Sequence, residues 1–177
     1  MTDDDYWKKQ YKDTWAQSSQ RELTIAKLLE DASGKKIQPI GLGAGSTDFL
    51  SGTALQHGHA KGDADFIVVD TNIHLEVTGP LVTFVDERQD LWIRPDKLAN
   101  AKQKLDDHET WVIHHLPKND LIRVVLLSKE FFTAFDNGEF SIVTPRIRGV
   151  QERYYAIPAV HQCVKSLSVL IDRLKKV

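Results

Sequence analysis

Two acidic residues in neighbouring apolar stretches, Asp65 and Glu76, are the side chains of this sequence best suited to chemistry. Asp65 begins the first stretch, Glu76 lies inside the second, and the polar residues 70–72 between them predict a turn that pairs two short strands. A carboxylate among Ile, Leu and Val side chains is unfavourable unless a cation or hydrogen bonds compensate its charge. Two such carboxylates side by side suit Mg²⁺, whose preferred ligands are oxygen atoms. The pattern therefore predicts a divalent metal site and, as a first hypothesis, metal-assisted chemistry on a phosphodiester.

The same residues resemble the signature of the PD-(D/E)XK nuclease superfamily, which is an Asp, a hairpin, and then a Glu or Asp followed two residues later by Lys. Residues 64–68 (Ala-Asp-Phe-Ile-Val) are similar to the first strand of that signature, and residues 75–79 (Leu-Glu-Val-Thr-Gly) are similar to the second. Thr78 is a departure, because it occupies the position of the family's Lys. The order of predicted elements between about residues 19 and 128 also resembles the family's core.

The resemblance implies which residues would hold the metal. Asp65, Glu76 and the backbone carbonyl of Val77 would bind one or two Mg²⁺ (or Mn²⁺) ions, and Glu22 on the first helix would support them through water. The ion would polarise the phosphate and lower the pKa of a bound water. Two simpler interpretations stay open. Asp65 and Glu76 could be a strand-end Asp and a solvent-facing Glu, and Glu22, the third residue after Ser19, could only cap its helix.

The basic residue of the family's site has no direct equivalent here. In the family, this Lys orients the attacking water and offsets negative charge, and the hydroxyl of Thr78 cannot supply that charge. Some members have the basic residue on the second helix, where this sequence has Lys97 and Lys102 within a helix predicted over residues 96–107. We therefore include Thr78 and Lys102 among the candidate catalytic residues, although both lysines could equally be ordinary solvated side chains of a helix.

The resemblance predicts a metal-dependent endonuclease, a hydrolase of phosphodiester bonds with DNA as the substrate that the family implies. Restriction, repair and mobile-element defence are the usual contexts of the family. Thr78 leaves an alternative open, which is a catalytically inactive module of the same fold that binds nucleic acid or a protein partner. Such a module could be a homodimeric assembly subunit that uses an N-terminal aromatic helix face and an apolar C-terminal stripe as its interface.

A basic and aromatic segment near the C-terminus is a second candidate for nucleic-acid binding. Arg146, Arg148 and Arg153 could follow a phosphate backbone, and the adjacent Tyr154 and Tyr155 could stack on bases. An ordinary solvated strand edge explains the same pattern equally well.

Other motifs are weaker. The glycine-rich residues 41–47 lack the Gly-Lys-Ser/Thr ending of a phosphate-binding loop, so they predict only a loop near the active cleft. His57 and His59 have no partners at zinc-ligand spacing, and His114 and His115 are neighbours on a predicted strand, where they must point to opposite faces. The sequence therefore does not predict a zinc site.

Size and composition are those of an ordinary globular protein. The chain has 177 residues, 41% of them hydrophobic, and a net charge of −2, which neither favours nor excludes nucleic acid. Its one cysteine, Cys163, excludes an intramolecular disulfide. No apolar run approaches the length of a membrane span, and the acidic start is unlike a secretion signal. We expect one domain over residues 1–177, in the cytoplasm and without a membrane.

Hydrophobic spacing predicts the elements that must position the acids. The N-terminal part is predicted to form an aromatic helix with Trp7, Tyr11 and Trp15, a break at Ser18 and Ser19, and a helix capped by Ser19 that continues to Gly34. The middle part is predicted to form a strand over residues 36–42, the hairpin of residues 65–79, a strand or turn at 81–85, the helix over 96–107, and strands at 110–116 and 121–127. A helix capped by Ser128, irregular or hairpin-like residues 139–157 and a last helix from Pro158 through Leu174 are predicted to follow. The predicted class is α/β, with a restriction-endonuclease-like core over residues 19–128 in which a mixed central sheet of four to five strands is flanked by helices. Residues 129–177 would form a C-terminal helical extension.

Overall fold

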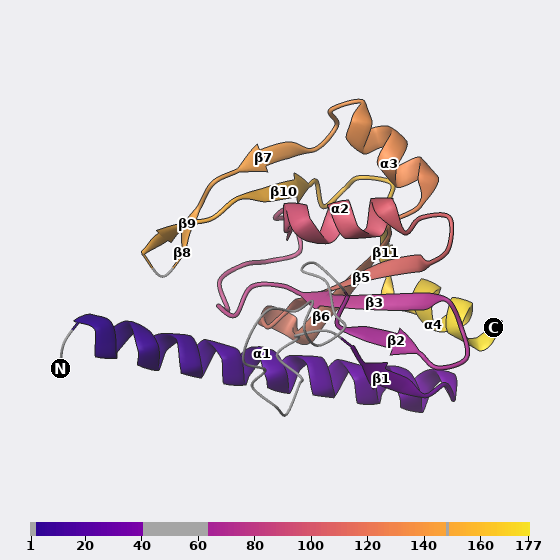
Figure 1. Ribbon diagram of the computed structural model, residues 1–177, viewed down its shortest axis with the longest axis horizontal. Helices are drawn as coiled ribbons and strands as arrows, with labels where there is room; N and C mark the ends of the chain where they lie inside the picture. The colour runs from indigo at the N-terminus through magenta and orange to yellow at the C-terminus, as the bar shows by residue number, and fades with distance from the viewer. Residues whose placement is uncertain (1–2, 41–63, 148) are drawn as a thin grey trace.

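The computed structural model describes residues 3–40, 64–147 and 149–177 (Figure 1). Its helices are α1 (Asp3–Ser33), α2 (Pro95–Gln103), α3 (Lys129–Asp136) and α4 (Leu167–Lys175), with a short 3₁₀ helix, η2, at Lys118–Asp120. Its strands are β1 (Ile37–Pro39), β2 (Phe66–Val68), β3 (Ile73–Thr78), β4 (Leu91–Ile93), β5 (Glu109–Leu116), β6 (Leu121–Leu126), β7 (Ser141–Val143), β8 (Arg146–Ile147), β9 (Val150–Gln151), β10 (Tyr154–Ile157) and β11 (Val164–Ser166). Among the described helices, none has the length and apolar character needed to cross a membrane.

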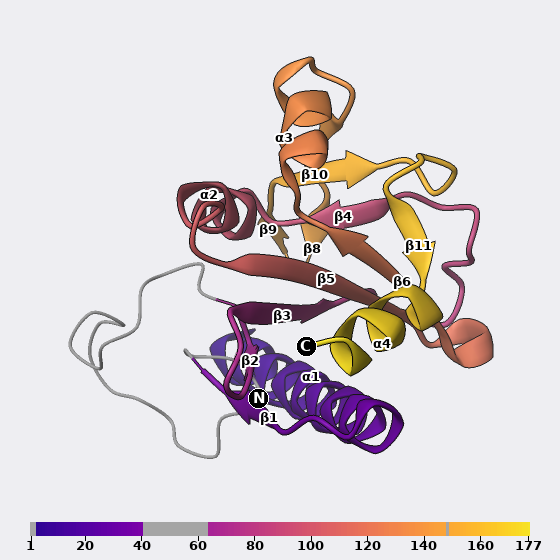
Figure 2. The same ribbon diagram turned by 90° about the vertical axis from the view of Figure 1, so that its right-hand side faces the viewer.

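The main sheet contains six strands in the order β1-β2-β3-β5-β6-β11. β3 and β5 are parallel, and the other neighbours are antiparallel. Helices α1 and α4 lie against one face of this sheet, whereas α2, α3 and a second sheet of β4, β10 and β7 lie on the opposite side (Figure 2). The predicted α/β class with a mixed sheet is confirmed, but within the described residues the sheet has six strands rather than four to five.

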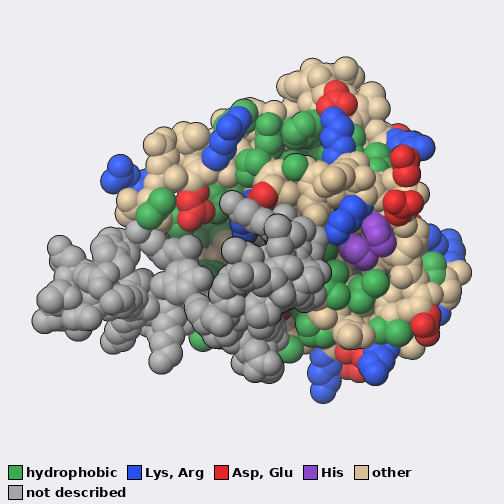
Figure 3. Space-filling model, in the orientation of Figure 1, with side chains coloured by type: hydrophobic (Ala, Val, Ile, Leu, Met, Phe, Trp, Pro, Cys, Tyr) green, Lys and Arg blue, Asp and Glu red, His purple; other side chains and the backbone are tan. Residues whose placement is uncertain are grey.

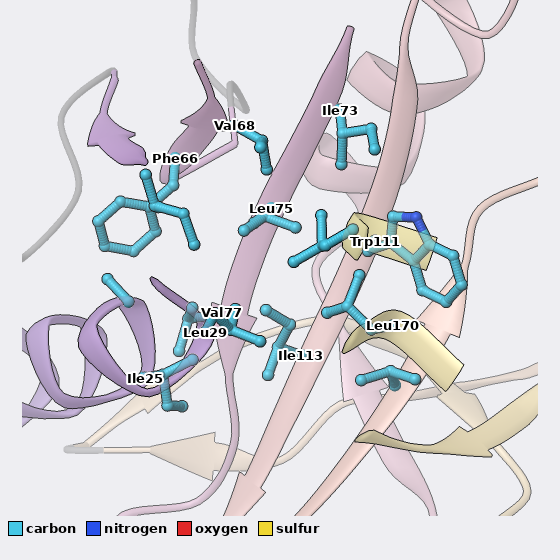
Figure 4. Packing of buried hydrophobic residues seen from close by; sticks show 14 residues of the cluster. Ile25, Leu29, Phe66, Val68, Ile73, Leu75, Val77, Trp111, Ile113 and Leu170 are labelled. Carbon is cyan, nitrogen blue, oxygen red and sulfur yellow. The ribbon is translucent and has the colours of Figure 1, made fainter. Parts of the chain in front are cut away.

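Strand β3 separates two hydrophobic cores because its side chains alternate between the faces of the sheet. Ile73, Leu75 and Val77 point into the core beneath α1 and α4, where Figure 4 shows Leu75 and Val77 among the side chains of α1 and β2. His74 and Glu76 therefore face the side of the sheet that α2 covers. The second core lies on that side and includes residues of α2, α3 and β4.

Helix α1 is continuous from Asp3 to Ser33, so the predicted break at Ser18 and Ser19 is wrong. Residues 19–22 lie within the helix, and Glu22 therefore cannot close a capping box there. A Ser inside a helix is only about 0.5 kcal/mol less favourable than Ala. Burial of Ile25 and Leu29 against the main sheet outweighs that difference (Figure 4).

The predicted helical extension over residues 129–177 is also wrong. This segment contains five strands as well as α3 and α4, and α4 begins at Leu167 rather than at Pro158. Residues 164–166 form the edge strand β11, in which Val164 pairs with Val125 of β6. The apolar C-terminal stripe is not a free surface, because Leu170 and Leu174 are fully buried in the core between α4 and α1.

The second sheet was predicted only in part. Residues 139–157 do form hairpin-like structure, since β7 pairs with β10 and the β8–β9 hairpin extends beyond them, away from the main sheet (Figure 1). Its third strand, β4, was not predicted, and residues 81–84 form bends rather than a strand.

Gly79 ends β3 in a conformation that requires glycine. Its φ is +136°, and a Cβ atom at this position would lie 2.1 Å from the carbonyl oxygen of His115. We expect Gly79→Ala to lower the free energy of unfolding by more than about 3 kcal/mol, because backbone strain and a backbone clash add together. Gly138→Ala is the control: φ is +75° with no atom within 4 Å, and a loss of only about 1–2 kcal/mol is expected. Equal losses of unfolding free energy in urea titrations of the two variants would contradict the conclusion that position 79 requires glycine.

Candidate active site

Asp65 is held where β2 begins, directly beside β3. Its backbone N–H donates to the carbonyl of Leu75 at 3.0 Å, and its Oδ2 accepts a hydrogen bond from the N–H of Val77 at 2.8 Å. Asp65 is thus tied to β3 on both sides of Glu76, by its backbone N–H at Leu75 and by its side chain at Val77. Asp65 is only 6% exposed, so its carboxyl group is buried next to that of Glu76.

Glu76 forms an ion pair with Lys97 from α2. Oε2 of Glu76 lies 3.0 Å from Nζ of Lys97, and both side chains are largely buried. Pro95, at the first position of α2, favours a helix start at this point and so places Lys97 in the first turn, above β3. The hairpin and the following helix therefore bring two carboxyl groups and one ammonium group together.

Glu22 brings a third carboxyl group from α1. It is 6% exposed, and its carboxyl hydrogen-bonds to that of Asp65, a contact that lowers the pKa of Asp65. Ionised carboxylates can only accept hydrogen bonds, so this contact requires a proton on one of the two groups.

Burial and mutual repulsion disfavour negative charge in this cluster. Burial raises the pKa of Asp65, and burial followed by the charge of Asp65 raises the pKa of Glu76 well above its usual 4.5. Burial alone would lower the pKa of Lys97, but the carboxylates of Glu76 and Asp65 outweigh it and raise that pKa. The single ammonium group does not fully compensate the acids.

This imbalance predicts a stability effect of Glu76→Gln. The raised pKa of Glu76 means that the folded protein holds this proton more tightly than the unfolded chain does. The resulting stabilisation is complete below pH 4.5 and is lost as the pH rises through the higher folded-state pKa. We expect metal-free Glu76→Gln to melt at least about 2 °C above wild type at neutral pH, with the difference disappearing near the ordinary pKa of Glu. Calorimetric Tm values across this pH range test it, and a lower Tm at neutral pH would contradict it.

The cluster fits a divalent cation by its chemistry. Carboxylate oxygens are hard ligands, and a bound cation would favour loss of the protons that these three carboxyl groups hold in its absence. As arranged here, the described residues include no group of three or more His, Cys, Asp and Glu side chains in a ready-made metal geometry.

The other predicted catalytic residues differ in their placement. Thr78 lies on β3, on the same face as Glu76 and in register with His114 of β5. Lys102 is not brought to the acids, because its Nζ pairs with Asp136 at 2.7 Å and lies over the rings of Phe132 and Phe135. Of the two lysines on this helix, the structure places Lys97 at the site, so the choice of Lys102 is corrected.

The predicted nucleic-acid contacts lie elsewhere on the chain. Arg146 is exposed on β8, and Arg153 is exposed immediately before β10. Arg148, the glycine-rich residues 41–47 and the residues 57–59 that contain two histidines lie outside the described residues.

Sequence reasoning did not single out Arg94, which acts on the acids, or Arg123, which is buried beside His114. The charge of Arg94, which precedes α2, lowers the pKa of Asp65. Arg123 on β6 donates to Nδ1 of His114 at 3.2 Å and to the carbonyls of Glu87 and Gln89 at 3.0 and 3.1 Å. Burial, then the charge of Arg123, lowers the pKa of His114 to about 3, so this imidazole is neutral.

A second arginine holds the same loop from the other end. Arg21 donates to the carbonyls of Gly79 and Pro80, directly after β3. Together with Arg123 it secures residues 79–90, which connect β3 to β4. For Arg123 the signal in the sequence was an arginine inside the apolar run of residues 121–127, because burial of such a residue requires partners.

Comparisons with known proteins show similarity at the level of the fold. No protein-family model matches the sequence, and no curated protein matches it. Among solved structures, the chain is similar to D212, a nuclease from a fusselovirus, with a TM-score of 0.50 over 88% of this chain and 89% of that chain. This chain has a fold similar to that of D212. The two proteins are 15% identical in sequence, so the similarity concerns the fold alone.

Proposed function

We propose that this protein is a Mg²⁺-dependent nuclease of the PD-(D/E)XK type that hydrolyses phosphodiester bonds, with DNA as its substrate. The main support is the buried cluster in which Asp65 and Glu76 of one hairpin meet Lys97 of the next helix. This is the combination of acids and base that the sequence motif implies, with the base supplied from α2 instead of from Thr78. The similarity of its fold to that of D212 agrees with this proposal.

Each residue of the cluster has a distinct role in the proposed reaction. Asp65 and Glu76 provide carboxylate oxygens for the metal, together with the carbonyl of Val77. Glu22 orients the Asp65 carboxyl through their hydrogen bond. Lys97, whose raised pKa keeps it protonated, offsets negative charge and orients the attacking water. When bound, Mg²⁺ would polarise the phosphate and stabilise the charge that develops on it.

A cleavage assay tests the proposal directly. Single-stranded and duplex DNA and RNA, each end-labelled, would be incubated with the protein in Mg²⁺, Mn²⁺ or EDTA. We expect cleavage of DNA that requires a divalent metal and stops in EDTA. Absence of cleavage together with absence of Mg²⁺ binding in calorimetry would overturn the proposal, and it would leave the alternative of an inactive binding module.

A further inference from the structure

Two aromatic side chains, the exposed Trp92 and the half-buried Tyr154, stack on the second sheet. The rings of Trp92 on β4 and Tyr154 on β10 have centroids 5.7 Å apart and planes 27° apart. The two residues are diagonal neighbours across the strands, because Trp92 pairs with Ala156, two positions after Tyr154. Trp92 is 40% exposed, which is unusual for so large an apolar side chain.

The alternation of β4 explains why this stack faces outward. Leu91 and Ile93 are buried in the second core, and Trp92 between them must point to the other face of the small sheet. Tyr155 packs against Phe135 of α3 on the inner face, which leaves Tyr154 on the outer face. Packing in the second core explains why Leu91, Ile93 and Tyr155 are apolar or aromatic. It does not explain why the outward-facing residues Trp92 and Tyr154 are both aromatic.

The stack is connected to the acid cluster through Arg94. Arg94 lies two residues after Trp92, and its charge acts on both Asp65 and Lys97. It is half-exposed and pairs with Asp96 at 2.6 Å. A nucleic acid whose phosphate reached the cluster would thus come under the charge of Arg94, two residues along the chain from Trp92.

Charge alone gives the protein little general affinity for a phosphate backbone. The net charge is −2, and Figure 3 shows basic and acidic side chains interspersed among the described residues of the face that it draws. Arg153, exposed and directly before Tyr154, adds a positive charge beside the aromatic stack, and the Glu152 carboxylate, which accepts a hydrogen bond from the Tyr154 hydroxyl, adds a negative one. Contacts to bases would therefore contribute more to affinity here than in a strongly basic protein.

We propose that Trp92 and Tyr154 form a platform on which an unpaired nucleobase of the substrate stacks, so that the nuclease acts on nucleic acid with a single-stranded segment. This proposal rests on the proposed function and names its substrate class. In a duplex the faces of the bases are covered by their neighbours and only their edges are accessible. A flat ring can extend an exposed aromatic stack only if it belongs to an unpaired base.

The test measures binding separately from cleavage. Fluorescence anisotropy in EDTA would record the affinity for a labelled oligothymidylate of about 16 nucleotides and for a duplex of the same length. Trp92→Ala is expected to weaken single-strand binding about tenfold or more and to change duplex binding much less. Trp92→Phe keeps a ring and should retain most of the affinity, and Phe84→Ala, which removes an aromatic side chain that is 75% exposed, should leave it unchanged.

The outcomes separate this proposal from the proposed function. If Trp92→Ala binds the oligothymidylate as well as wild type does, or loses single-strand and duplex affinity equally, the platform is overturned, whatever the cleavage assay shows. Absence of binding by wild type overturns it too. If light scattering shows a dimer that Trp92→Ala dissociates without a change in affinity, the stack is a contact between copies of this chain. Selective loss of single-strand binding supports the platform even if no cleavage is detected.

Discussion

Asp65→Asn and Glu76→Gln are each expected to reduce metal-dependent cleavage on the order of 1000-fold, to the background of the assay. Each substitution removes the charge of a metal ligand but keeps its size, and a bound metal contributes several kcal/mol to transition-state stabilisation. Both residues are buried in the same cluster, so an acid on the surface of the protein cannot take over their role as metal ligands. Initial rates at saturating Mg²⁺, together with Mg²⁺ titration by calorimetry, measure the effect.

Asp136→Asn is the matched control for this experiment. Asp136 is an exposed acid that pairs with Lys102 on the other flank of α2, so the same chemical change there should leave the rate within about twofold of wild type. Circular dichroism should show all three variants folded, because neutral isosteres do not disturb packing. Wild-type rates in both Asp65→Asn and Glu76→Gln would remove the cluster as the active site.

The acid pair could be predicted from the sequence because its geometry is local. The turn between β2 and β3 is closed by Thr71, whose hydroxyl donates to the carbonyl of Val68 at 2.8 Å and accepts from the N–H of Ile73 at 3.0 Å. Once that turn is set, the alternation of the strands decides that Asp65 and Glu76 share a face. No information from distant parts of the chain is needed.

The choice between Lys97 and Lys102 depends on tertiary packing and could not be predicted. Both lysines flank the buried stripe of Leu98 and Ala101, one on each side of α2. The flank of Lys97 faces β3, whereas the flank of Lys102 faces α3. The sequence gives the apolar face of the helix but does not indicate which neighbour lies on which side.

The wrong prediction that the last helix begins at Pro158 has a similar physical origin. Val160, Cys163 and Val164 follow Pro158 at spacing that suits a helix, yet residues 164–166 instead add a strand to the edge of the main sheet. Hydrogen bonds to an exposed edge of β6 outweigh the local preference. The three-residue strand β4 was missed because so short a segment has no period, and its partner β10 lies about 60 residues further along the chain.

Lys97→Ala is expected to lower the rate of metal-dependent cleavage about 100-fold, because it removes the ammonium group that pairs with Glu76 and that would offset the developing negative charge. Lys102→Ala, on the same helix, is the matched control and should change the rate little.

Thr78→Lys would place an ammonium group on the same face of β3 as Glu76, at the position of the family's Lys. In wild type this addition should have little effect, since Lys97 already fills the role, but in the Lys97→Ala background it should restore part of the lost rate. Single-turnover cleavage rates of Lys97→Ala, Lys102→Ala, Thr78→Lys and the double variant with Lys97→Ala and Thr78→Lys measure these effects. Unchanged cleavage by Lys97→Ala, or a large gain from Thr78→Lys alone, would show that Lys97 is only the structural counter-ion of Glu76.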